Sequence, residues 1–205
     1  MSVHSALYEQ YETALDRRRN GGNEKSYTVY LYHQGLDKIL KKCGEETFEV
    51  VIAAKGEDVS EILGELNDVL YHMTVLLCER GVPFDAVLAA LNRRCASEGK
   101  QVDELFRVIA DRRHSGETES YTRYLFEQGL DKILKKVGEA CSLLLIAAKN
   151  GDTDGIAEES ADLIYHLLVM MEEKKIPLSA FEAELIRRSQ KTGNLKTAHS
   201  TNLNT

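Results

Sequence analysis

The chain contains the stretch Gln34-Gly35-Leu36-Asp37-Lys38-Ile39-Leu40-Lys41-Lys42 and repeats it unchanged at residues 128–136, an offset of 94. Working outward from this stretch without gaps, residues 26–58 and 120–152 share 21 of 33 residues. The same offset pairs residues 68–72 with residues 162–166. A repeat of this length predicts a tandem duplication, in which two similar units together bury one core.

Both repeats are predicted to be helical. The 205 residues include only two prolines, Pro83 and Pro177, at matching places, and they show no sustained period-2 alternation. In the first repeat we expect helices over about 5–19, 27–55, 60–80 and 83–94, with a break near Gly35 in the second of them. The fold class is therefore all-α, with two tandem helical bundles.

The repeat also predicts the domain organisation. We expect a first unit at residues 1–98, a second at 99–190, and a polar, disordered tail at 191–205. A unit of about 90 residues buries only part of its surface, so the two copies are expected to pack together as an internal pseudo-dimer, with further homo-dimerisation left open.

Composition excludes several classes of protein. The net charge of −7 argues against a nucleic-acid partner, whose binding surface would be basic. The four cysteines form no C-x-x-C pair, which argues against a disulfide framework. No apolar run approaches 18 residues, and the start has no signal-peptide pattern, so we expect no membrane partner and a cytoplasmic, soluble protein.

The two repeats differ at two acidic positions that could take part in a reaction. On the helix wheel of 27–55, Glu46 and Glu49 lie at the edge of the apolar stripe, where a carboxylate pair faces a cleft between helices. Their counterparts in the second repeat are Ala140 and Leu143. A chemical function is therefore expected in the first repeat only.

The next helix carries a second acidic line, formed by Glu61, Glu65, Asp68 and His72 at i+3 and i+4 spacing. Carboxylates that face each other across two helices repel unless a cation lies between them. Oxygen ligands without imidazole or thiolate clusters favour Mg²⁺, with Mn²⁺ as an alternative, and Mg²⁺ in turn favours a nucleotide polyphosphate substrate. His72 is expected to form hydrogen bonds beside the metal and not to bind it.

Three stretches carry a family resemblance: Ser26-Tyr27-Thr28, the run from Lys41 to Lys55, and Glu65-Leu66-Asn67-Asp68-Val69-Leu70-Tyr71-His72. They resemble phosphoribosyl-ATP pyrophosphohydrolase of histidine biosynthesis, a member of the MazG-like all-α nucleotide pyrophosphohydrolases. That group is marked by Glu-x-x-Glu followed by Glu-x-x-Asp, which correspond here to Glu46/Glu49 and Glu65/Asp68. The resemblance implies Mg²⁺-dependent hydrolysis of phosphoribosyl-ATP to phosphoribosyl-AMP and pyrophosphate, with these four residues as metal ligands.

The second repeat departs from this pattern. It keeps Glu139, Glu159 and Asp162 but lacks the Glu-x-x-Glu pair, so its metal site is expected to be broken. Residues 143–148 are apolar nearly all round, which predicts a buried packing element. Glutamates introduced at Ala140 and Leu143 would then destabilise the protein.

Further roles follow from the charge of the substrate. Glu45, or one of the metal ligands, is a candidate for the general base. The candidates for binding phosphates are Lys41, Lys42, Lys55, Arg93 and Arg94. Their counterparts Lys135, Lys136, Lys149, Arg187 and Arg188 are retained, so the second repeat could lend phosphate contacts to the first.

Two other functions are compatible with the same residues. One is a house-cleaning (d)NTP pyrophosphohydrolase, because the same metal frame would support it. The other is a catalytically weak nucleotide-binding or regulatory module, for which the altered second repeat is a precedent. A panel of substrates assayed with Mg²⁺ would separate these alternatives.

Overall fold

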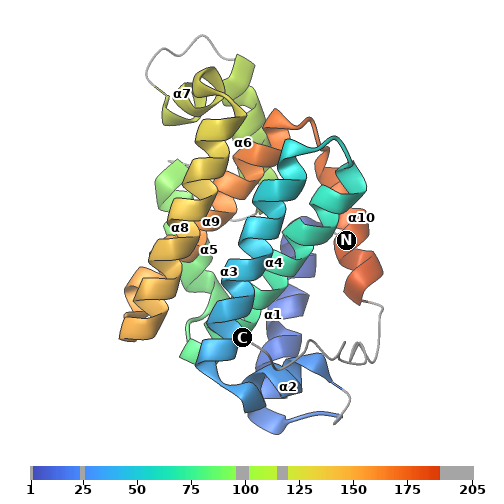
Figure 1. The fold of residues 1–205 in the computed structure, drawn as a ribbon, viewed down its shortest axis with the longest axis vertical. Coiled ribbons are helices and arrows are strands. Elements are labelled where there is room, and N and C mark those ends of the chain that lie inside the picture. The colour runs from blue at the N-terminus through green and yellow to red at the C-terminus, as the bar shows by residue number, and fades with distance from the viewer. Residues whose placement is uncertain (1, 24–25, 96–101, 115–119, 190–205) are drawn as a thin grey trace, which may run out of the picture.

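The computed structural model describes residues 2–23, 26–95, 102–114 and 120–189, which form ten α-helices and no strand (Figure 1). The first repeat contains α1 (Val3–Asn20), α2 (Tyr27–Gln34), α3 (Leu36–Lys55), α4 (Val59–Arg80) and α5 (Phe84–Cys95). The second contains α6 (Val102–His114), α7 (Tyr121–Gln128), α8 (Leu130–Asn150), α9 (Thr153–Glu173) and α10 (Leu178–Ser189). The predicted all-α fold is confirmed, whereas residues 191–205 lie outside the described part. Within that part, no helix is both long enough and apolar enough to cross a membrane.

The glycine in the repeated stretch breaks the long helix, as predicted. Gly35 has φ +80°, and its N–H donates to the carbonyl oxygens of Leu31 and Tyr32, which ends α2. Gly129 ends α7 in the same way with φ +79°. A residue with a Cβ would be strained at this φ, so glycine allows the chain to turn here before the long helix begins.

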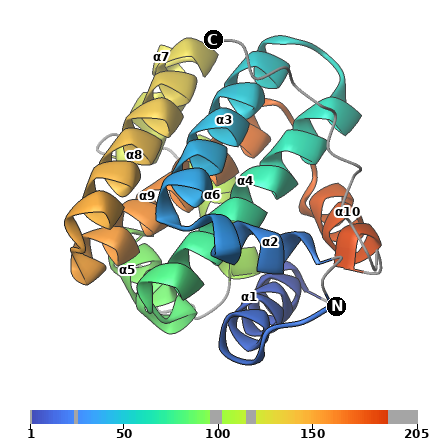
Figure 2. The same cartoon turned by 60° about the horizontal axis from the view of Figure 1, so that its bottom comes forward.

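The two long helices α3 and α8 lie side by side and run antiparallel (Figure 2). Lys55 at the end of α3 bonds Asp131 at the start of α8 at 2.7 Å, and Lys149 at the end of α8 bonds Asp37 at the start of α3. This reciprocity is what a two-fold relation between the repeats requires. One hydrophobic core runs through both repeats, so the predicted internal pseudo-dimer is present.

The last helix of each repeat crosses to the other repeat. Helix α5 lies against α9 of the second repeat, and α10 lies against α1 and α4 of the first (Figure 1). Buried residues at these contacts include Leu91 on α5 and Phe181 on α10. Helical periodicity alone does not predict this exchange, which brings Arg188 of the second repeat next to Asp68 of the first.

Candidate metal centre

Three of the four predicted metal ligands meet between α3 and α4. Glu46, Glu49 and Glu65 each offer a carboxylate oxygen, and these oxygens lie within 4.8 Å of one another. The two helices are antiparallel neighbours joined by the short turn at 56–58, where the side chain of Asp58 caps α4 by accepting from the N–H groups of Ser60 and Glu61. No other such group of potential metal ligands occurs among the described residues.

The electrostatics of this cluster show repulsion between its acids. Burial, the neighbouring carboxyl of Glu49 and the charges of Asp68 and Glu46 together raise the pKa of Glu65 to about 7. Glu46 is only 6% exposed, and burial also raises the pKa of its carboxyl, while Lys42 opposes the shift. A divalent cation would relieve this repulsion, since it compensates several negative charges at once.

The fourth predicted ligand, Asp68, binds a protein cation. It lies one turn after Glu65 on α4, and its Oδ1 accepts a hydrogen bond from Nη1 of Arg188 on α10. Asp68 is still close enough for its charge to raise the pKa values of both Glu46 and Glu65. It therefore borders the three-glutamate cluster, and its predicted role as a ligand stays a prediction.

Lys42 is the predicted phosphate ligand that lies closest to the acids. Its Nζ is 2.6 Å from Glu46 Oε1 and 3.1 Å from Glu45 Oε2. Although burial opposes it, these hydrogen bonds raise the pKa of Lys42. Lys42 is thus a fixed positive charge at the edge of the cluster.

Glu45, the predicted general base, lies outside the cluster and shares Lys42 with Glu46. Lys41, mostly exposed, lies 3.5 Å from Glu45 on the same helix. Burial opposes the effect, but the hydrogen bond from Lys42 and the charges of both lysines together lower the pKa of Glu45. Glu139 makes the same contacts with Lys136 and Lys135 in the second repeat, so this arrangement is not specific to the half that has the acids.

The remaining predicted phosphate ligands point elsewhere. Lys55 reaches α8, where it bonds Asp131, and Arg93 reaches α9, where it bonds Glu158. Arg94 lies on α5, but its side chain is outside the described part of the structure. Arg188, which the sequence offered only as the retained counterpart of Arg94, is the arginine that reaches the acidic residues of the first repeat.

His72 forms hydrogen bonds beside the acids, as expected for a supporting residue. Its Nδ1–H donates to the carbonyl oxygen of Asp68 at 2.8 Å, which leaves Nε2 to accept from the hydroxyl of Tyr27 at 3.5 Å. Burial lowers the pKa of His72 to about 4, so the ring is neutral at pH 7. His166 and Tyr121 repeat this geometry in the second half. The hydrogen bonds of the histidine are therefore present in both repeats, although only the first has the acidic pair.

The second repeat corrects one prediction. Leu143 is 48% exposed and Ile146 57% exposed, so residues 143–148 do not form a fully buried element. Only Leu144, Ala147 and Ala148 of this run are buried. The run is apolar on its solvent face as well as on its core face, and an all-apolar helical segment can be mistaken for a buried one because periodicity is then lost.

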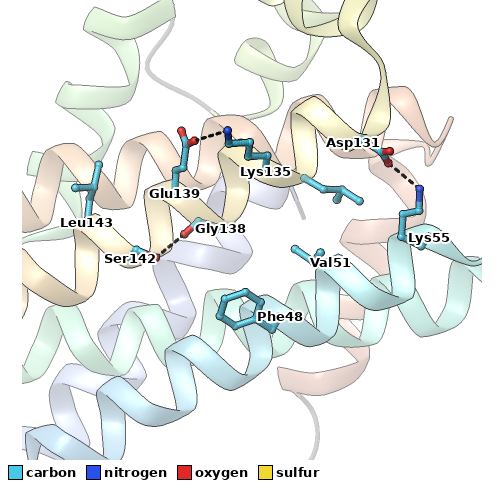
Figure 3. A pocket seen from close by; sticks show the side chains of 10 residues that line it. Phe48, Val51, Lys55, Asp131, Lys135, Gly138, Glu139, Ser142 and Leu143 are labelled. Atoms are coloured by element: carbon cyan, nitrogen blue, oxygen red, sulfur yellow. Dashed lines mark hydrogen bonds and ion pairs between the residues drawn. The ribbon is translucent and has the colours of Figure 1, made fainter.

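A shallow groove of about 700 Å³ lies between α3 and α8 but does not contain the acidic cluster (Figure 3). Phe48 and Val51 on α3 face Gly138 on α8, and Lys55 with Asp131 closes one end. The lining is largely apolar and includes none of the three clustered glutamates. This groove is therefore not the candidate reaction site, which is marked by the three clustered glutamates.

Comparison with known proteins identifies the family to which both repeats are similar. The family model for phosphoribosyl-ATP pyrophosphohydrolase matches the chain twice, over residues 8–95 and 102–189. Both matches fall inside the predicted units at 1–98 and 99–190, whose boundaries remain predictions.

Individual relatives match about one repeat each. The chain is similar to phosphoribosyl-ATP pyrophosphatase of Clostridium novyi, with 48% identity over 95 residues, which is 46% of this chain and 86% of the relative. It is also similar to the proteins of that name from Clostridium botulinum (50% over 100 residues, 49% of this chain and 91% of the relative) and Streptococcus thermophilus (55% over 91 residues, 44% and 84%). No solved structure matches the chain. With two family matches that together cover most of its length, the chain belongs to the phosphoribosyl-ATP pyrophosphohydrolase family as a tandem duplication of the family domain.

Proposed function

We propose that the first repeat hydrolyses phosphoribosyl-ATP to phosphoribosyl-AMP and pyrophosphate, a step of histidine biosynthesis, with Mg²⁺ as the metal and Mn²⁺ as a substitute. The observation that carries the proposal is the convergence of Glu46, Glu49 and Glu65, which only the first repeat contains. Relatives named phosphoribosyl-ATP pyrophosphatase support the choice of substrate. We assign the reaction to the cytoplasm, in keeping with the sequence-based expectation.

The donor set fits magnesium. Three carboxylates provide hard oxygen ligands without imidazole or thiolate, which suits Mg²⁺ better than Zn²⁺. The raised pKa of Glu65 supports this fit, because a carboxyl in this position needs a nearby positive charge to ionise fully at neutral pH. Bound Mg²⁺ would neutralise phosphate charge and acidify a water molecule.

The chain's own residues have distinct roles in this proposal. Glu46, Glu49 and Glu65 would hold the metal, with Asp68 as a further ligand. Lys42 keeps Glu46 ionised and in place through its 2.6 Å contact. Glu45 remains the candidate that accepts the proton of the attacking water, although its lowered pKa makes it a weak base. Attack at the α-phosphorus would break the bond to the bridging oxygen, which leaves with pyrophosphate.

The test compares equivalent acids of the two repeats. Glu65→Gln removes a charge from the cluster and should lower kcat/KM for phosphoribosyl-ATP by at least about 100-fold, because metal-assisted charge stabilisation contributes several kcal/mol. Glu159→Gln alters the matching acid of the second repeat, where Ala140 and Leu143 replace the first pair, and should leave the rate close to that of the unmodified protein. Pyrophosphate release at saturating Mg²⁺ is the readout, with Glu46→Gln and Glu49→Gln as further variants.

The same assay separates the alternatives. Phosphoribosyl-ATP, ATP, dUTP and dCTP are compared at equal concentration. A preference for a deoxynucleotide would replace the proposal with a house-cleaning (d)NTP pyrophosphohydrolase. Binding of nucleotides without pyrophosphate release from any of them would indicate a regulatory module. Equal activity in Glu65→Gln and Glu159→Gln would refute the placement of the site.

A further inference from the structure

We propose that Arg188, delivered by the second repeat, binds the polyphosphate of the substrate in the site of the first repeat. The inference rests on the proposed function. It also gives the second repeat a part in the reaction, although its own acidic cluster is missing.

Helix α10 places this arginine at the edge of the acidic cluster. Its Nη1 donates to Asp68 Oδ1, and its Nη2 donates to the carbonyl oxygen of Gly64 at 2.9 Å, both on α4 of the first repeat. Its Nε donates to Glu184 Oε1 at 2.9 Å on its own helix. The guanidinium is thus oriented from three sides by two different repeats.

The guanidinium also remains accessible to a ligand. The side chain of Arg188 is 30% exposed, and Asp68 beside it is 34% exposed. A guanidinium has five N–H donors, and the described contacts use three of them. The remaining donors lie next to acids that would hold the metal, where the negatively charged oxygens of a bound polyphosphate must lie.

Position 64 distinguishes the two halves in a way that supports this role. In the first repeat it is Gly64, which has no side chain to compete for the guanidinium, so Arg188 reaches Asp68. In the second repeat the same position is Glu158, which forms an ion pair with Arg93 of α5, the counterpart of Arg187. A Cβ at position 64 would lie 3.6 Å from Nη2 of Arg188, so glycine at this position leaves room for the guanidinium beside α4.

The chemistry of the pair favours exchange with phosphate. Asp68 holds one guanidinium nitrogen, while the carbonyl of Gly64 and the carboxylate of Glu184 fix the plane of the group. An arginine fork matches two oxygens of a phosphate in the same way that it matches a carboxylate. When the substrate enters, its phosphate oxygens accept from Arg188, and Asp68 is freed to act as a ligand.

The main test compares two neighbouring arginines on α10. Arg188→Gln should lower kcat/KM for phosphoribosyl-ATP by about 100-fold, as expected for loss of one preorganised donor to developing charge. Arg187→Gln is the matched control, because Arg187 also bonds Glu184 but is 55% exposed and bonds no residue of the acidic cluster. The control should stay within about twofold of the unmodified protein, in line with the small contribution of exposed ion pairs.

A second readout does not depend on turnover. Titration calorimetry with pyrophosphate and Mg²⁺ measures polyphosphate binding directly. Arg188→Gln should weaken this binding by about 10-fold or more, since a hydrogen bond to a charged group contributes that much, and Arg187→Gln should not change it. Arg188→Lys keeps the charge without the fork, so it should bind pyrophosphate more weakly than the unmodified protein and more tightly than Arg188→Gln.

Several outcomes would overturn the inference. If Arg188→Gln only lowers the melting temperature and leaves kcat/KM and pyrophosphate binding unchanged, Arg188 is an anchor between helices. If it binds Mg²⁺ more tightly and reacts at least as fast, Arg188 merely neutralises Asp68. If Arg188→Gln does not fold, Arg188→Lys provides the test. A pyrophosphate affinity equal to that of the unmodified protein would then refute two-point binding of phosphate by the guanidinium. Failure of the proposed function is recognised separately, because the unmodified protein would then release no pyrophosphate from phosphoribosyl-ATP.

Discussion

At the scale of single residues, the two repeats show which side chains depend on the acids and which do not. Glu46 and Glu49 became Ala140 and Leu143, yet Tyr27, His72 and their counterparts Tyr121 and His166 keep the same hydrogen bonds. These hydrogen bonds therefore serve the packing of the helices as well as any reaction. A buried polar group without its partner is costly, which accounts for their survival in a half without the acidic pair.

The histidine predicts a pH dependence of stability. His72 is 3% exposed, and its pKa is lowered to about 4 by burial, against 6.5 in an unfolded chain. Between these values the unfolded state binds one proton more than the folded state. The free energy of unfolding should therefore fall as the pH drops from 6.5 to 4, by roughly 3 kcal/mol from this group.

Urea unfolding at several pH values checks this prediction. His72→Gln should reduce the slope of unfolding free energy against pH in this window by about one proton. The exposed His33 on α2 provides the control, because His33→Gln alters a ring that is not buried. An unchanged slope in His72→Gln would show that other groups cause the acid sensitivity.

At the scale of elements, α8 retains the shape of the helix that carries the acids. Ala140 is buried where Glu46 is buried, and Lys136 stands in the position of Lys42. Leu143 is exposed, like Glu49. The substitution therefore removed charges from a helix without closing the surface around them.

This geometry reverses the prediction made from the sequence for the second repeat. Ala140→Glu combined with Leu143→Glu should be tolerated, because Lys136 can pair with the first glutamate, as Lys42 pairs with Glu46, and solvent can hydrate the second. The melting temperature should stay within about 3 °C of the unmodified protein, which corresponds to roughly 1 kcal/mol.

Calorimetric titration should then detect Mg²⁺ binding in the second repeat, in addition to that of the first. Ala140→Gln with Leu143→Gln has similar volume without charge and should gain no site. A large loss of stability in the glutamate variant, unaffected by Mg²⁺, would mean that the sequence-based expectation was right and the structure-based one wrong.

At the scale of the whole molecule, the exchange of α5 and α10 makes the repeats interdependent. Without the second repeat, α1 and α4 lose the contact with α10, and without the first, α9 loses the contact with α5. The single core that spans both repeats would also be cut open. Exposed apolar surface of this kind favours association or unfolding.

A chain divided near residue 99 tests this interdependence. Each half alone should melt without a cooperative transition or should self-associate, because a unit of about 90 residues with an open core is marginally stable. Mixed in equal amounts, the halves should form a 1:1 complex that regains helix content and pyrophosphate release. Sedimentation and circular dichroism follow both. Two folded, monomeric halves that do not bind each other would contradict the exchange of helices.

The sequence by itself determined the duplication, the all-helical fold, the break at Gly35 and the family, because these depend on local patterns and on residues compared at a constant offset. It also identified Glu46, Glu49 and Glu65, since acids at the apolar edge of adjacent helices must face each other. The tertiary structure alone decided that α10 crosses to the other repeat, that Arg188 reaches Asp68, and that Leu143 faces solvent. The physical reason is that helical periodicity gives the face of a helix but not its partner, and two similar repeats offer the same apolar partner surface twice. Only the packing of the whole chain determines which of these two surfaces each helix contacts.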